Sequence, residues 1–253
     1  MPNANPSHLD LQAIARQVMQ QRGFQPDFPS EVPKQLADLK AHPPQVAAAR
    51  DVRDLRNLLW SSIDNDTSRD LDQIEFAEQL PNGNVKVMIG IADVDAFVPK
   101  GTSIDLHAAR ETTTVYAGVR NFPMLPEELS TGATSLLENQ DLLSVIIEFV
   151  VDGTGIVSAP NVYRAVVHNK AQLQYNSVGA WLEGKSSAPP KVPQHNKSSF
   201  FGQNSKCLSQ HGAVIALVRC PYFLKTTIKP DKQGLVVTIP VSHTILSEGD
   251  WHR

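Results

Sequence analysis

The sequence has little of what defines several protein classes. Its 253 residues include only two cysteines, Cys207 and Cys220, and no Cys/His pattern spaced like a zinc site surrounds them. This excludes a disulfide-rich secreted fold and a zinc module, and we expect two reduced thiols. The chain also lacks the run of about 20 apolar residues that a membrane span needs. Its start has no apolar stretch like that of a secretory signal.

The sequence also lacks a large excess of charge of either sign, since it has 23 Lys and Arg and 26 Asp and Glu. The formal net charge of −3 is not that of a generic nucleic-acid binder. The charge is uneven, because residues 1–194 carry a net −7 and residues 195–253 a net +4. An acidic body is compatible with a metal-dependent nuclease, because bound cations reverse the sign at the site. None of the eight histidines is spaced from another like a pair of metal ligands.

The length and the 41% hydrophobic content allow a sizeable core, in one large domain or two small ones. Local patterns predict helices at residues 9–22, 34–40, 103–112, 126–130 and 175–183. They predict strands at residues 74–80, 85–94, 142–151, 156–158, 162–168, 213–218 and 235–241. Residues 47–60 are predicted as a turn or short helix. The fold class expected is α+β, with a mixed or mostly antiparallel sheet and flanking helices.

Composition divides the chain into three parts. Residues 1–45 form an N-terminal helical segment that holds five prolines between residues 26 and 44. Residues 46–184 carry the apolar strand patterns of the main domain. Residues 185–253 are predicted as a linker and a divergent C-terminal segment, because Lys, Ser, Pro, Gln and Asn dominate from residue 184 to about residue 206.

A cluster of aspartates stands in the segment SIDNDTSRDLDQIEFAE, residues 62–78. Asp64, Asp66, Asp70 and Asp72 fall within nine residues. Packed carboxylates repel one another, so a protein that concentrates them usually places a cation between them. Oxygen ligands favour Mg²⁺, Mn²⁺ or Ca²⁺ over zinc or copper. A solvated acidic turn is the alternative, because aspartate is common in turns.

A calcium loop is a second alternative for the same segment. Counted from Asp64 as position 1 to Glu75 as position 12, acidic or hydroxyl side chains occupy the ligand positions of an EF-hand. Position 6 is Arg69, where that loop requires glycine. The segment beyond is predicted as a strand and not as an exiting helix, so both points weigh against calcium.

Longer motifs follow one another between residues 54 and 184. They are SIDNDTSRDLDQ, IGIADVDAFVPKGTSIDLHAARETTTVY, FPMLPEELSTGATSLLENQDLLSVIIEFVVDGTGIV and YRAVVHNKAQLQY. Together and in this order they resemble the ribonuclease II family. The resemblance covers the N-terminal portion of the family's RNB catalytic domain, in a bacterial subgroup without cold-shock domains.

The resemblance implies a Mg²⁺-dependent 3′→5′ exoribonuclease, with Mn²⁺ as a substitute metal, that hydrolyses single-stranded RNA to nucleoside 5′-monophosphates. Asp64, Asp70 and Asp72 match three of the family's four catalytic aspartates, which would also bind the metal. Gln73 stands at the fourth position and offers an amide oxygen without charge. Tyr116 matches the tyrosine that stacks on or orients the 3′-terminal nucleotide.

Other features keep two interpretations open. Asp93, in the IADV strand, either supports the metal site or accepts a hydrogen bond at a strand end. The chain matches only the first part of the family's catalytic domain, so a noncatalytic RNA- or partner-binding remnant is the alternative function. We predict a cytoplasmic monomer whose partner is single-stranded RNA and not a membrane.

Overall fold

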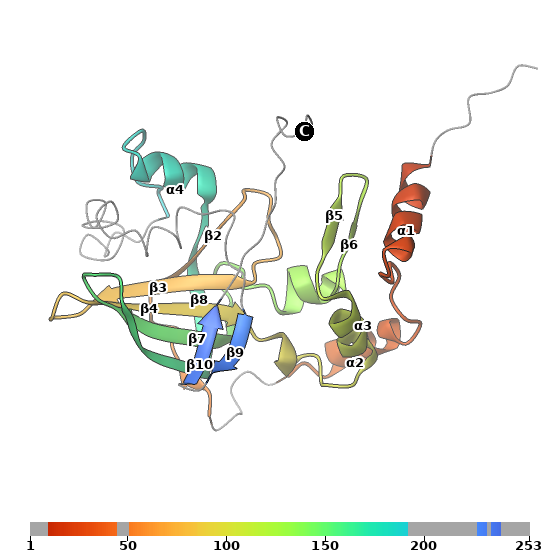
Figure 1. The fold of residues 1–253 in the computed structure, drawn as a ribbon, viewed down its shortest axis with the longest axis horizontal. Helices are drawn as coiled ribbons and strands as arrows, with labels where there is room; N and C mark the ends of the chain where they lie inside the picture. The colour runs from red at the N-terminus through yellow and green to blue at the C-terminus, as the bar shows by residue number, and fades with distance from the viewer. Residues whose placement is uncertain (1–9, 45–50, 192–226, 232–233, 239–253) are drawn as a thin grey trace, which may run out of the picture.

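The computed structural model describes residues 10–44, 51–191, 227–231 and 234–238 (Figure 1). The helices are α1 (Leu11–Gln21), α2 (Val32–Ala41), α3 (Ser103–Glu111) and α4 (Tyr175–Leu182). The strands are β1 (Arg53–Asp54), β2 (Trp60–Asp64), β3 (Gln73–Gln79), β4 (Val85–Ala92), β5 (Val115–Ala117), β6 (Arg120–Phe122), β7 (Asp141–Val151), β8 (Val157–Gln174), β9 (Thr227–Asp231) and β10 (Gly234–Thr238). Short 3₁₀ and π-helical turns stand at Val94–Ala96 and Glu128–Ala133. Within these described ranges no helix is both long and apolar enough to cross a bilayer.

The main sheet closes on itself. Its strand order is β1-β8-β2-β3-β4-β7, and β7 also pairs with β8 to complete a ring. β1 and β2 run parallel to β8, and the other neighbours are antiparallel. The 18 residues of β8 make this closure possible, because its first part pairs with β7 and its last part with β2. The predicted α+β fold with a mixed sheet is confirmed.

The main core lies inside this closed sheet, since β2, β3, β4, β7 and β8 all contribute to it. Its buried side chains are Trp60, Leu71, Ile74, Met88, Leu136, Ile146, Ala165 and Val167. Burying a large apolar side chain stabilises a fold by roughly 1.5–3 kcal/mol. Leu71 comes from the aspartate segment and is only 1% exposed. The core therefore anchors that segment between Asp70 and Asp72.

Smaller cores attach the helices to the sheet. α2 and α3 pack together around Val32 and Ile104. α4 covers β2 and β8 through Val178, which packs with Ile63 and Leu173. Figure 1 shows α2, α3 and the β5–β6 hairpin together beside the closed sheet, with α4 on another side of it.

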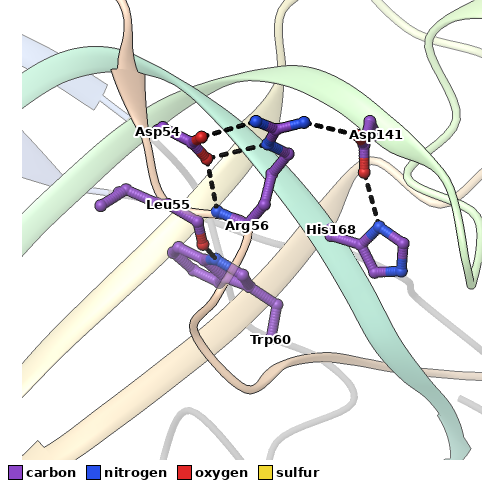
Figure 2. A network of polar contacts seen from close by, with 6 residues as sticks. All are labelled: Asp54, Leu55, Arg56, Trp60, Asp141 and His168. Carbon is purple, nitrogen blue, oxygen red and sulfur yellow. Dashed lines mark hydrogen bonds and ion pairs between the residues drawn. The ribbon is translucent and has the colours of Figure 1, made fainter.

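A polar network ties the chain before β2 to the closing strands (Figure 2). The Arg56 guanidinium donates to both carboxylate oxygens of Asp54, at 2.9 and 2.6 Å, and to Asp141 Oδ2 at 3.0 Å. His168 Nδ1 lies 2.6 Å from the other oxygen of Asp141. Beside them, Trp60 Nε1 donates to the carbonyl of Leu55 at 2.9 Å. These bonds hold β2 in place at its start.

Local signals predicted most elements correctly, and two predictions need correction. Residues 56–57 form a turn, as predicted for part of residues 47–60. Residues 53–54 and 60, however, lie in strands, because they pair with β8, which is remote in sequence. The strands predicted at 156–158 and 162–168 are parts of one strand, β8. The strand predicted at residues 213–218 lies outside the described residues, and the one at 235–241 overlaps β10.

Candidate metal and RNA site

The aspartates predicted as catalytic stand in one connection between two paired strands. β2 ends at Asp64, β3 begins at Gln73, and the two strands run antiparallel. The connection therefore begins and ends at the same end of the closed sheet. Asp64 is half-buried, whereas Asp70 and Asp72 are exposed. We call residues 64–73 the aspartate loop.

Asp64 shapes the start of this loop. Its Oδ1 accepts hydrogen bonds from the backbone amide of Asn65 at 2.6 Å and from the hydroxyl of Ser68 at 2.8 Å. Aspartate favours such local bonds to the residues that follow it, which is why it is common in turns. The loop conformation is thus encoded in part by one of the predicted metal ligands.

Ser135 holds the middle of the loop from a distant part of the chain. Its hydroxyl accepts a hydrogen bond from the amide of Leu71 at 3.0 Å and donates one to the carbonyl of Arg69 at 2.7 Å. The amide of Leu136 donates to the carbonyl of Leu71 at 2.8 Å. Gln172 adds a bond of 3.3 Å to the carbonyl of Ser68. The loop backbone is therefore fixed from both sides.

Tyr116 reaches the loop from the β5–β6 hairpin. Its hydroxyl donates a hydrogen bond of 3.0 Å to Asp70 Oδ2, across 46 residues of sequence. Burial and then the charge of Asp70 raise the pKa of Tyr116 to about 12. The hydroxyl therefore stays protonated at neutral pH, while 57% of the residue remains exposed. The structure brings together two residues that the sequence assigned to the site separately.

Two residues that were not among the predicted site residues also face this region. Glu75 on β3 has its pKa raised to about 8 by burial and then by the charges of Asp72 and Asp64. Tyr175, the first residue of α4, has its pKa raised to about 12 by burial and then by Asp64, Glu75 and Asp72. Asp64, Asp72 and Glu75 are thus close enough for their charges to act on one another. The same charges also act on the hydroxyl of Tyr175. Tyr175 ends the last of the quoted motifs, which was its only signal in the sequence.

Gln73 lies at the start of β3 and is half-buried. Its Nε2 donates to Glu75 Oε1 at 3.1 Å. The segment after the aspartate loop is a strand, so the helix that an EF-hand requires is missing there, and the calcium-loop alternative is wrong.

The donor chemistry fits a hard divalent cation. Carboxylate and amide oxygens are the ligands that Mg²⁺ takes in proteins. Glu75 Oε2 is enclosed and has no hydrogen-bond partner among the described residues, and the charges nearest to it are negative. Among the same residues, however, no three His, Cys, Asp or Glu side chains are already gathered closely enough to hold a metal ion. Asp64 is held instead by Asn65 and Ser68, and Asp70 by Tyr116.

Asp93 has a structural role. It is 2% exposed at the end of β4, and the Nε of Arg164 on β8 pairs with its Oδ2 at 2.9 Å. Arg164 also pairs with Asp95 at 2.5 Å. Burying the Asp93 carboxylate requires this pairing. Of the two interpretations of Asp93, the structure supports the strand-end acceptor.

The chain is similar to known proteins over most of its length. The family profile described as the RNB domain matches residues 52–231. Ribonuclease R of Thermotoga maritima is 36% identical over 169 residues, which is 66% of this chain and 23% of that protein. Ribonuclease R of Escherichia coli is 36% identical over 157 residues, or 62% of this chain and 19% of that protein. The chain thus spans about a fifth of the length of these relatives.

Solved structures share the fold. RNase R of Mycoplasma genitalium in complex with ribose-methylated single-stranded RNA matches with a TM-score of 0.66 and 24% identity, covering 91% of this chain and 36% of that one. The same enzyme in complex with double-stranded RNA also gives a TM-score of 0.66 and covers 41% of that chain. At this identity the likeness establishes the arrangement of strands and helices.

Proposed function

Because the chain belongs to the RNB domain family, we propose that it carries the metal-binding part of a 3′→5′ exoribonuclease. The proposed reaction is Mg²⁺-dependent hydrolysis of single-stranded RNA to nucleoside 5′-monophosphates. The observation that carries this proposal is the hydrogen bond between Tyr116 and Asp70, which places an exposed aromatic ring beside the aspartate loop. A ring there can stack on the last base while the carboxylates lie next to its phosphate.

The residues have separate roles in this proposal. Asp64, Asp70, Asp72 and Gln73 would hold the cation through their side-chain oxygens. A divalent ion held there would polarise the scissile phosphate and lower the pKa of a bound water. Tyr116 orients the 3′-terminal nucleotide, and its stacking ignores base identity, as a non-specific degrader requires.

The relatives support RNA as the partner. The two relatives described above are named ribonuclease R, and two matching structures of one such enzyme hold single- or double-stranded RNA. We propose single-stranded RNA for this chain because stacking on one tyrosine requires an unpaired terminal base. We further propose that the protein acts as a cytoplasmic monomer.

A second candidate is RNA binding without cleavage. It is favoured by the lack, within the described part of the chain, of three acidic, His or Cys side chains already gathered around one point. In this case Tyr116 and the loop would contact RNA, but no metal would act on the phosphate.

Release of AMP from oligo(A) in the presence of Mg²⁺ distinguishes the two candidates. We expect the wild-type chain to release AMP, and Asp72→Asn to release none, because the amide removes a charge from the metal site. Asp66→Asn is the matched control, because Asp66 is an exposed loop aspartate outside the predicted site. Equal release by wild type and Asp72→Asn would overturn the nuclease proposal. RNA binding without release by the wild type would favour the second candidate.

A further inference from the structure

Gln73 and Glu75 stand two residues apart on β3 and share one face of that strand. Side chains at i and i+2 of a strand point the same way. Ile74 and Phe76, between and after them, belong to the core inside the closed sheet. Gln73 and Glu75 therefore face outward together, and the 3.1 Å bond from Gln73 Nε2 to Glu75 Oε1 joins them.

Glu75 is not an ordinary surface glutamate. The residue is half-buried, but its Oε2 is enclosed and without a hydrogen-bond partner among the described residues. Glu78, on the same strand, shows the ordinary case, since it is exposed and pairs with Lys86 at 2.9 Å. An enclosed carboxylate oxygen without a partner is costly, so a fold that keeps one commonly has a ligand for it.

We propose that Glu75 supplies, when a cation is bound, the carboxylate that Gln73 lacks, so that the acidic residues of the metal centre are Asp64, Asp70, Asp72 and Glu75. This inference rests on the metal site of the proposed function. The family resemblance implies a carboxylate at the position of Gln73. Glu75, the next residue on the same face of β3, has a carboxyl group that can take its place. Positions 73 and 75 are close together, since two residues of a strand span about 6.6 Å.

The hydrogen bond between the two side chains gives Gln73 a defined role. A carboxylate oxygen that accepts from an amide nitrogen fixes which way the amide is turned. With its Nε2 directed to Glu75, Gln73 keeps its oxygen as the atom that can face a cation. Glu75 thus adds charge to the site and positions the neutral ligand beside it.

Mn²⁺ binding to the 253-residue chain, measured by electron paramagnetic resonance and calorimetry, tests this inference without any turnover. We expect Glu75→Gln to weaken Mn²⁺ binding by about 10- to 100-fold, the usual effect of losing a supporting carboxylate. The matched control Glu78→Gln makes the same substitution near the exposed end of β3, and this variant should bind Mn²⁺ as the wild type does. Circular dichroism establishes that each variant is folded.

A charge swap separates the role of charge from a role in folding. The double variant Gln73→Asp with Glu75→Gln returns the carboxylate to the position that the family resemblance assigns to it, and should restore wild-type Mn²⁺ affinity. Unchanged affinity in Glu75→Gln, or no restoration in a folded double variant, would overturn the inference.

Asp72→Asn distinguishes this inference from the proposed function. If Asp72→Asn loses Mn²⁺ while Glu75→Gln keeps it, the role of Glu75 is wrong and the metal site stands. If neither variant changes Mn²⁺ binding, the metal site itself is wrong.

Discussion

The hydroxyl of Ser135 accepts a 3.0 Å hydrogen bond from the backbone amide of Leu71, in the middle of the aspartate loop. The same hydroxyl donates to the carbonyl of Arg69, so one buried side chain spans the residues on both sides of Asp70. The orientation of Asp70 and Asp72 therefore depends on a residue that touches neither carboxylate in these bonds. Ser135 is a positioning residue of the proposed site.

Ser135→Ala tests this relationship. The amide of Leu71 is left without its partner, which costs about 1–3 kcal/mol of unfolding free energy. We expect a lower rate of AMP release with little change in KM, because the loop loses its alignment and the Tyr116 ring stays available for RNA. Urea unfolding and steady-state kinetics measure the two effects. Ser158→Ala is the control, since Ser158 is exposed at the other end of the closed sheet. A loss of stability with unchanged kinetics would contradict the positioning role.

Tyr116 has two separable functions, stacking through its ring and hydrogen bonding to Asp70 through its hydroxyl. We expect Tyr116→Ala to weaken oligo(A) binding by about 1–3 kcal/mol, the usual value of one stacked base. Tyr116→Phe keeps the ring and should bind oligo(A) nearly as the wild type does. Fluorescence anisotropy with labelled oligo(A) in an Asp72→Asn background measures binding without cleavage. Equal losses in the two Tyr116 variants would show that the hydroxyl, and not the ring, contacts RNA.

Sequence reasoning succeeded where the signal is local. The hairpin of β3 and β4 follows from Asn82-Gly83, where Gly83 has a φ of 85° that glycine adopts without strain. α1 follows from its apolar periodicity. The strand and helix patterns also predicted the fold class, and the spacing of the four aspartates marked the aspartate loop.

Prediction from the sequence failed where a feature depends on a contact between residues that are far apart in the chain. β1 has only two residues and exists because it pairs with Ala165 and Val166 of β8. Ser135 carries no local pattern that marks it as the partner of Leu71, 64 residues away. Glu75 was counted only as a calcium-loop position, because nothing in the sequence shows that its Oε2 is enclosed. Each of these three features could be recognised only from the three-dimensional structure.

The close packing inside the sheet predicts that Gly90 of β4 does not tolerate a side chain. A Cβ at Gly90 would lie 2.8 Å from Ser144 Oγ and 3.0 Å from Ile74 Cγ1, closer than real contacts allow. Ser144 cannot simply turn away, because its hydroxyl bonds to the carbonyl of Ile91. We expect Gly90→Ala to lower the free energy of unfolding by about 1–3 kcal/mol, the usual cost of overpacking.

Urea unfolding compares Gly90→Ala with Gly153→Ala, where the added Cβ would meet no atom within 4 Å. The second variant should be close to the wild type in stability. A Gly90→Ala protein as stable as Gly153→Ala would show that the strands at this point are free to separate.

His107 on α3 makes the stability of the fold depend on pH. The residue is 4% exposed and packs on the ring of Phe28 at 4.4 Å between centroids. Burial lowers the pKa of His107 from 6.5, while Glu111 and the backbone of Pro123 act in the opposite direction. Below about pH 6.5 the unfolded chain therefore binds a proton that the folded chain resists, and the free energy of unfolding falls as the pH falls.

His107→Gln cannot take up this proton, so its unfolding free energy should fall less between pH 7 and pH 5 than that of the wild type. The difference in slope has an upper limit of about 1.4 kcal/mol per pH unit, the value for one whole proton. Urea unfolding at pH 7, 6 and 5 measures it, and His42→Gln, at the exposed end of α2, controls for the loss of an imidazole. Parallel stability curves for wild type and His107→Gln would mean that the buried imidazole accepts its proton in the folded state as readily as in the unfolded chain.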